Sequence, residues 1–163
     1  MLCAVRTCVL DDWEAAAADL TDWTPVRALG DLVIRTDHLA DPADLVSALQ
    51  GFDTVVLMRE RTRFPREVIQ ALPDLRLVVT TGPRNAVLDL QACADRGITV
   101  CHTANSRAAV VELTWALILG ALQHIPTLTA SMAAGQWQPH VGVELDGMTL
   151  GLLGLGRTGS RMA

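Results

Sequence analysis

Short apolar runs rich in β-branched residues recur from residue 2 to residue 101, and a segment of helical character follows each of the first four. Strands are expected at 2–10, 32–36, 54–58, 77–80 and 98–101. Because the runs are apolar at successive positions, both faces of each strand should be buried. Strands that alternate with helices and are buried on both faces predict an α/β fold with a parallel sheet.

The segments between these runs carry signals for helix starts and ends. Helices are expected at 13–20, 43–49, 66–72 and 87–96. Asp11 or Asp12 caps the first helix, Asp41 with Pro42 opens the second, and Gly97 ends the fourth. For units of this number and size, a doubly wound parallel sheet with flavodoxin-like strand order is the most economical arrangement.

The pattern changes in the last third of the chain. A long helix is expected at 107–124; it is apolar on nearly every side and therefore needs cover on more than one side. Pro126 breaks it, and a second helical stretch and an irregular arm fill 126–140. A new strand is expected at 148–153. We expect a sheet domain at 1–101, an interdomain and dimerisation segment at 102–147, and the truncated start of a Rossmann domain at 148–163.

The charge balance excludes two classes of partner. All 13 basic residues are Arg, and against 18 acidic residues they leave a net charge of −5. This balance provides no basic surface for nucleic acid or for an anionic membrane. The longest apolar stretch, 108–122, contains Glu112 and is shorter than the roughly 20 residues that span a bilayer as a helix.

The cysteines indicate a reducing environment. Cys3, Cys8, Cys93 and Cys101 form no paired motif and have no histidine at ligand spacing. We expect buried thiols on strands, with no disulfide framework and no metal site. A cytoplasmic location follows from this reasoning.

A glycine motif follows the last expected strand. Gly154, Gly156 and Gly159 fit the spacing of a dinucleotide-binding loop. In such a loop the first glycine permits a tight turn, the second lets the backbone approach a pyrophosphate, and the third lets the helix pack on the strand. The choice between NAD and NADP stays open.

Polar residues follow the strands where a doubly wound sheet binds ligands, beyond the carboxyl ends. Gly82 and neighbouring N–H groups are candidates for holding a carboxylate, with Arg59 or Arg84 supplying the charge. Arg61 and Arg63 are interpreted as a solvated rim. His102 is a general acid or base only if a partner orients it, and otherwise it is a packed or loop histidine.

Five segments follow one another in order from residue 77: LRLVVTTGPRN, DLQACADRGITVCHT, VELTWALILGAL, ASMAAGQW and ELDGMTLGLLGLGRTG. In these segments the chain resembles the N-terminal half of a D-isomer-specific 2-hydroxyacid dehydrogenase of the phosphoglycerate dehydrogenase type. The resemblance implies an NAD(P)-dependent oxidoreductase that reduces 2-keto acids or oxidises D-2-hydroxy acids. It also implies a homodimer, formed through the helix 107–124 and the arm 126–140.

The resemblance assigns roles to particular residues. Thr81 and Gly82 match the loop whose backbone holds the substrate carboxylate, and Arg59 matches an Arg that helps to bind substrate in some members. Gly154, Gly156 and Gly159, with Arg157 and Thr158 between them, match the pyrophosphate loop. The chain reads Gly-Pro-Arg-Asn at 82–85 where the family commonly has Gly-x-Asp-Asn, so the substrate stays open.

Two hypotheses follow for the activity of the chain itself. In the first, it is a portion of a dehydrogenase whose catalytic Arg, Glu and His are expected beyond residue 163. The chain alone then has no turnover, and whether it binds a cofactor by itself stays open. In the second, it is a non-enzymatic flavodoxin-like module that dimerises or binds a partner through its apolar helix.

Overall fold

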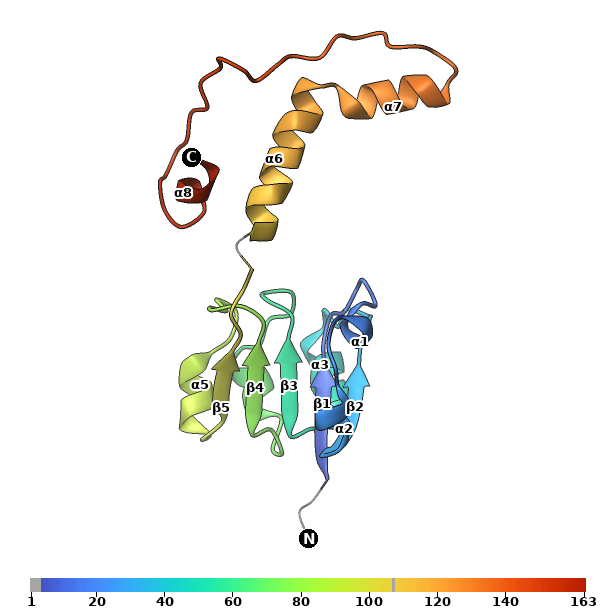
Figure 1. Cartoon of the computed structure of the whole chain (residues 1–163). Coiled ribbons are helices and arrows are strands. Elements are labelled where there is room, and N and C mark those ends of the chain that lie inside the picture. Colours follow the sequence, from blue (N-terminus) through green and yellow to red (C-terminus); the bar gives the residue numbers. More distant parts are fainter. Residues whose placement is uncertain (1–3, 107) are drawn as a thin grey trace. The chain divides into compact units, whose positions relative to one another are not determined.

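The contacts along the chain divide it into two units (Figure 1). The computed structural model describes residues 4–106 and 108–163, so Cys3, Arg107 and the predicted strand start at residue 2 lie outside the described residues. Unit 1 extends to Asn105 and unit 2 begins at Ser106.

Unit 1 is built on a five-stranded sheet in which every pairing is parallel. Its strands are β1 (Val5–Val9), β2 (Gly30–Ile34), β3 (Thr54–Leu57), β4 (Leu77–Thr80) and β5 (Thr99–His102). Their order in the sheet is β2-β1-β3-β4-β5, which confirms the predicted flavodoxin-like arrangement. All the strands therefore end at one edge, and the loops that leave the strands gather there (Figure 1).

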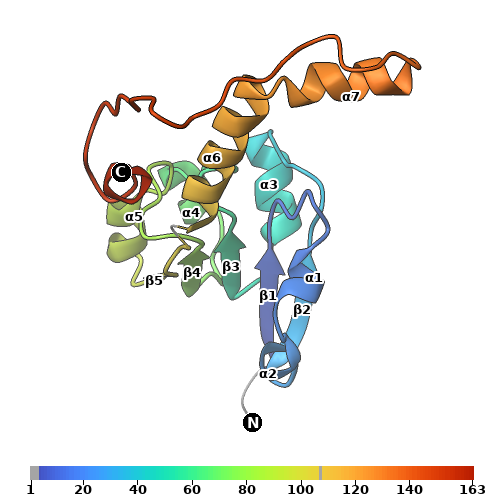
Figure 2. The same ribbon diagram turned by 45° about the horizontal axis from the view of Figure 1, so that its top comes forward.

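Five helices connect the strands of unit 1: α1 (Ala17–Leu20), α2 (Thr24–Arg27), α3 (Pro42–Leu49), α4 (Arg66–Gln70) and α5 (Leu90–Asp95). Right-handed crossovers place α3, α4 and α5 on one face and α1 and α2 on the other, as Figures 1 and 2 show. Asp41 caps α3 by accepting the N–H groups of Ala43 and Asp44, as predicted. Asp12 accepts the N–H groups of Ala16 and Ala17 at the start of α1. The helix α2 has no counterpart in the prediction.

The core lies between the sheet and the face formed by α3, α4 and α5. Cys8, Val55 and Val78 sit side by side on β1, β3 and β4, and each has 0% of its surface exposed. The prediction of buried thiols on strands holds for Cys8, but Cys93 is buried on the helix α5 and Cys101 is exposed on the strand β5. Cys101 lies on the edge strand β5, whose residues have a strand neighbour on one side only.

Unit 2 contains α6 (Ala108–Leu122), α7 (Ile125–Ala133) and α8 (Gly159–Met162). The break between α6 and α7 falls at His124, which has a left-handed φ of 51°, and Pro126 lies in the first turn of α7. The predicted strand at 148–153 is wrong, because this segment has no strand conformation. A strand needs a neighbour for its N–H and C=O groups, and no other strand occurs in the described part of unit 2.

No single helix in the described ranges is long and apolar enough to cross a membrane. The helices α6 and α7 reach the required length only as a pair, and they are bent by 60° relative to each other.

Candidate functional site

The loop after β3 and the loop after β4 meet at the carboxyl edge of the sheet. The Arg59 N–H donates a hydrogen bond of 2.9 Å to the Thr81 hydroxyl. The Arg59 carbonyl accepts a hydrogen bond of 2.8 Å from the Asn85 side-chain amide. Arg59 itself has a φ of 58°, a left-handed conformation that is uncommon for a residue with a Cβ atom. The main chain of Arg59 is therefore held from both sides by the next loop of the sheet.

Gly82 is the second residue of the loop after β4, and it has a φ of 97°. A Cβ atom built on Gly82 would overlap the Arg59 guanidinium. The absence of a side chain therefore lets the guanidinium lie against the Gly82 backbone. The structure brings together all three residues that the resemblance assigned to substrate: Arg59, Thr81 and Gly82.

The backbone N–H groups of this loop already have acceptors within unit 1. The Thr81 N–H donates to the Leu57 carbonyl at 3.0 Å, and the Gly82 N–H donates to the Thr103 hydroxyl at 2.9 Å. A hydroxyl is more easily displaced than a strand carbonyl, so Gly82 is the amide that a carboxylate can take over. The sequence predicted no role for Thr103.

The Arg59 guanidinium remains accessible at this edge of the sheet. Its side chain is 52% exposed, and its Nε lies 3.6 Å from a carboxylate oxygen of Glu60. A pair at this distance and exposure is weak, so an incoming anion can compete with Glu60 for Arg59.

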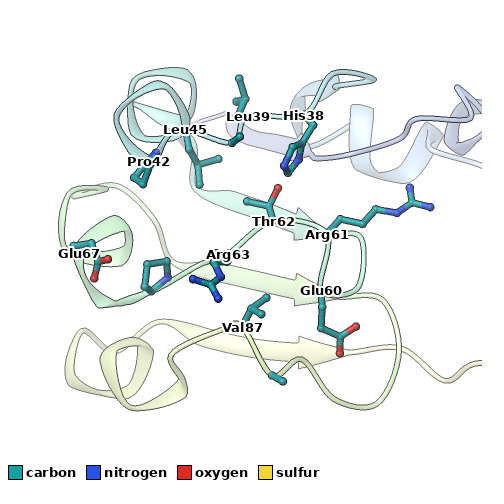
Figure 3. Close-up of a pocket in the computed structure, with 13 residues that line it drawn as sticks. His38, Leu39, Pro42, Leu45, Glu60, Arg61, Thr62, Arg63, Glu67 and Val87 are labelled. Carbon is teal, nitrogen blue, oxygen red and sulfur yellow. The ribbon is translucent and has the colours of Figure 1, made fainter.

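Two cavities flank the loop pair. One of about 650 Å³ is lined by residues that include His38, Thr62 and Arg63 (Figure 3). The other, of about 610 Å³, is lined by residues that include Asn85 and His102. Neither cavity is lined by Arg59, Thr81 or Gly82. Their neighbours in sequence do line cavities: Glu60 lines both, and Thr80 and Pro83 line the second.

His102 has an ordinary environment for a surface histidine. Its side chain is exposed, and no described residue hydrogen-bonds to its ring. Arg84 also lines the second cavity, and it makes no ion pair within the described residues. Because nothing orients His102, a general acid or base role has no geometric support here.

Asp11 is the centre of a buried network that sequence reasoning did not find. Its carboxylate is 1% exposed, and it contacts the His38 Nδ1 at 2.8 Å and the Thr62 hydroxyl at 2.7 Å. The network joins the loops after β1, β2 and β3. A carboxylate directly after an apolar strand was the available signal, but the sequence analysis assigned Asp11 only to helix capping.

The interpretation of Arg61 as part of a solvated rim is wrong. Its guanidinium binds both carboxylate oxygens of Glu14 at 2.9 and 3.1 Å, donates to the Asp11 carbonyl, and lies 4.3 Å from the centre of the Trp13 ring. The hydrogen bond from Arg61 lowers the pKa of Glu14. Arg63, in contrast, is exposed, and Figure 3 shows the two side chains leaving the loop in different directions.

The glycine loop forms a tight turn within unit 2. Gly154 has a φ of 92°, and a Cβ atom on Gly159 would overlap the Gly154 carbonyl oxygen. The Ser160 N–H donates to the Gly156 carbonyl at 2.9 Å as α8 begins. Residues 154–158 are exposed. Gly154 and Gly159 are therefore glycines for steric reasons, which agrees with the roles of the first and third glycines in a dinucleotide-binding loop.

A parallel sheet with helices on both faces is an α/β fold, and in proteins of this fold ligands bind beyond the carboxyl ends of the strands. The model for the catalytic domain of the D-isomer specific 2-hydroxyacid dehydrogenases matches residues 12–151. The chain belongs to this family of oxidoreductases, as the sequence motifs implied.

Individual relatives agree with this assignment. The chain is 37% identical over 123 residues to human D-3-phosphoglycerate dehydrogenase, and the match covers 74% of this chain and 23% of the human protein. It is 31% identical over 136 residues to the hydroxypyruvate reductase of Thermotoga maritima, covering 82% of this chain and 44% of that protein.

The structure resembles that of a phosphoglycerate oxidoreductase from Vibrio cholerae O395. The TM-score is 0.87 at 33% identity, and the match covers 97% of this chain and 51% of that chain. The chain thus spans about half the length of this relative, and less than half of the two curated proteins.

Proposed function

We propose that this chain binds a 2-keto acid or a D-2-hydroxy acid as the substrate-binding part of an NAD(P)-dependent dehydrogenase. The observation that carries the proposal is the placement of the Arg59 guanidinium against the Gly82 backbone. This arrangement offers a forked cation and a main-chain amide to one carboxylate. The domains at 1–101, 102–147 and 148–163 and a cytoplasmic location belong to the same proposal.

The substrate carboxylate binds by replacing two existing contacts. It replaces Glu60 as the partner of the Arg59 guanidinium, and it replaces the Thr103 hydroxyl as the acceptor of the Gly82 N–H. Thr81 keeps its N–H on the Leu57 carbonyl and its hydroxyl on Arg59, so it supports the loop without donating its N–H to the ligand.

The glycine loop fits the pyrophosphate of NAD or NADP. Gly154, Gly156, Arg157, Thr158 and Gly159 would hold it, because their spacing is that of a dinucleotide-binding loop. The crowding between Gly159 and the Gly154 carbonyl leaves room only for hydrogen at Gly159, which agrees with the role of the third glycine in such a loop. When bound, the nicotinamide exchanges a hydride with the carbon that carries the substrate hydroxyl.

Binding, measured on residues 1–163, tests the proposal without requiring turnover. Pyruvate, glyoxylate and hydroxypyruvate are added to 15N-labelled protein, and amide shifts are followed by NMR. We expect saturable shifts at Arg59, Gly82 and Thr103, and none from pyruvamide, which lacks the carboxylate. Shifts confined to other parts of unit 1, or equal shifts from pyruvamide, would contradict the proposal. We expect no oxidation of NADH by residues 1–163 alone.

A second role, self-association, is favoured by the apolar surface of α6. Val110, Leu113 and Leu117 are 56%, 60% and 65% exposed, which is unusual for large apolar side chains on one helix. We propose that α6, with the arm 126–140, binds a second copy of this chain.

Light scattering distinguishes a dimer from a monomer. We expect a dimer for residues 1–163 and a monomer for Leu113→Glu with Leu117→Glu. Leu29→Glu is the control, because Leu29 is 65% exposed but lies in unit 1. A monomeric parent chain at tens of micromolar would contradict this second role.

A further inference from the structure

Arg59 holds a strained backbone conformation next to the proposed carboxylate site. Its φ of 58° is left-handed, and Arg has no short polar side chain that would stabilise this region locally. Such residues persist only where their surroundings hold them, and they occur often at ligand sites. The contacts that hold Arg59 therefore matter for where its guanidinium lies.

Asn85 is the side chain that holds the Arg59 carbonyl. Its Nδ2 donates to Arg59 O at 2.8 Å and to the Thr80 hydroxyl at 3.1 Å. Its Oδ1 accepts the Val87 N–H at 3.1 Å. Both amide hydrogens are thus used, one toward the loop after β3 and one toward the end of β4. Thr80 is buried, so this second anchor is fixed.

We propose that Asn85 is a positioning residue for the substrate carboxylate. It holds Arg59 in the left-handed conformation, and this conformation keeps the guanidinium against Gly82. Without Asn85, Arg59 relaxes toward negative φ, which turns its Cα–Cβ bond and moves the guanidinium away from Gly82. The inference rests on the proposed function, because it concerns the same carboxylate site.

Asn85→Asp and Asn85→Ala separate this role from simple support of the loop. Asp keeps the acceptor for the Val87 N–H but has no hydrogen to donate to Arg59 or Thr80. Ala lacks all three contacts without adding a charge. Asn105→Asp makes the same chemical change as Asn85→Asp at an exposed position and is the matched control.

Two readouts are taken on each variant. The first is the intraresidue NOE between the amide and α hydrogens of Arg59, which is strong only at positive φ and needs no ligand. The second is the dissociation constant for pyruvate. We expect both Asn85 variants to lose the strong NOE and to bind pyruvate about tenfold more weakly. Asn105→Asp should match the parent chain in both.

Each contrary result has a separate meaning. If Asn85→Asp keeps the strong NOE, or if Arg59 changes conformation while pyruvate affinity is unchanged, the positioning role is wrong and the proposed function stands. Weaker binding in Asn85→Asp alone would indicate charge repulsion and also overturn the positioning role. If the parent chain binds no 2-keto acid, the proposed function fails, while the NOE still tests whether Asn85 holds Arg59.

If the Asn85 variants do not fold, Thr81→Val tests the other half of the clamp that Thr81 and Asn85 form on the Arg59 main chain. It removes the hydroxyl that accepts the Arg59 N–H and donates to the Leu57 carbonyl, and it leaves the Arg59 N–H with the Leu57 carbonyl at 3.1 Å. A weaker NOE and weaker pyruvate binding support the clamp. A Thr81→Val protein that keeps both parental values would overturn it.

Discussion

The Thr103 hydroxyl accepts a 2.9 Å hydrogen bond from the Gly82 N–H, the amide that a substrate carboxylate is proposed to use. Thr103 also donates its own N–H to the Thr80 carbonyl, so it is fixed beside the loop after β4. The hydroxyl therefore occupies the position proposed for a carboxylate oxygen, and under this proposal the ligand has to displace it.

Thr103→Val removes this competitor and should strengthen pyruvate binding. We expect a gain of about two- to tenfold, because a neutral hydrogen bond contributes about 0.5–1.5 kcal/mol. The free energy of unfolding should fall by a similar amount. Calorimetric titration and urea unfolding measure the two effects, with Thr99→Val on the exposed edge strand as control. Unchanged or weaker binding would show that the hydroxyl does not compete with the ligand.

Arg59→Lys should weaken pyruvate binding by about tenfold, because an ammonium lacks the forked donors that match a carboxylate. Glu60→Gln should strengthen it, since the carboxylate that competes for Arg59 is removed. Arg63→Lys is the control at an exposed neighbouring position. Calorimetric titration measures the opposite changes in affinity. Equal losses in Arg59→Lys and Arg63→Lys would show that the effect is not specific to Arg59, and no loss in Arg59→Lys would show that the forked geometry is not needed.

Gly82→Ala should destabilise the protein for two reasons, the left-handed φ and the overlap with the Arg59 guanidinium. Gly97→Ala shares the first reason only, because no atom lies within 4 Å of a Cβ built there. We expect losses in the free energy of unfolding of about 2–3 kcal/mol and about 1 kcal/mol. Urea unfolding measures both, and equal losses would show that the Arg59 contact costs nothing.

Asp11→Ala should reduce the free energy of unfolding by about 2–4 kcal/mol, because it leaves the Thr62 hydroxyl and the His38 ring without their buried acceptor. Asp11→Asn keeps the shape and tolerates the left-handed φ of 58°, so its loss should be smaller. Asp74→Ala, at an exposed position, is the control. Urea denaturation followed by circular dichroism gives the three values. An unchanged free energy of unfolding in Asp11→Ala would show that the network does not stabilise the fold.

Burial raises the pKa of the Cys8 thiol from 9.0 to about 11. The folded state therefore keeps this proton to a higher pH than the unfolded state. The contribution of the Cys8 thiol to the free energy of unfolding is fully present below pH 9.0 and is lost as the pH rises toward 11. We expect a loss of about 2 kcal/mol over this interval. The chain contains no Lys and no Tyr, so few other side chains titrate there.

Urea unfolding at several pH values checks this dependence in a Cys3→Ser background. Cys8→Ala should flatten most of it, and the raised pKa of Cys93 accounts for a smaller part that should remain. An equally steep pH dependence in Cys8→Ala would assign the effect to other groups. At neutral pH, a disulfide reagent should modify the exposed Cys101 quickly and the buried Cys8 and Cys93 slowly.

The amino-acid sequence predicted the sheet well because its signals are local. A run such as 77–80 is short, apolar at successive positions and rich in β-branched residues, and these properties together favour a strand. The expected burial of both faces is wrong for β2 and β5, which lie at the two edges of the sheet and have no fully buried residue. Asp41 and Gly97 mark a helix start and a helix end through contacts within a few residues. The doubly wound arrangement predicted that the polar loops after the strands meet at the carboxyl edge, and the family resemblance assigned Arg59, Thr81 and Gly82 to the substrate there.

The strand predicted at 148–153 shows where local signals end. Its residues have strand propensity, but a strand is stable only when a neighbour pairs with its main chain. Cys101 is a similar case, since its exposure depends on the position of β5 at the edge of the sheet.

The sequence by itself thus determined the five strands of unit 1 and every helix between them except α2, because each of these elements depends on residues close together in the chain. Only the tertiary structure decided the residue pairs that form the candidate site and the buried network at Asp11. Asn85 and Arg59 are 26 residues apart, Thr103 and Gly82 are 21 apart, and His38 and Asp11 are 27 apart. These contacts form because parallel strands return each loop to the same edge, and no local pattern records which loop atoms then meet.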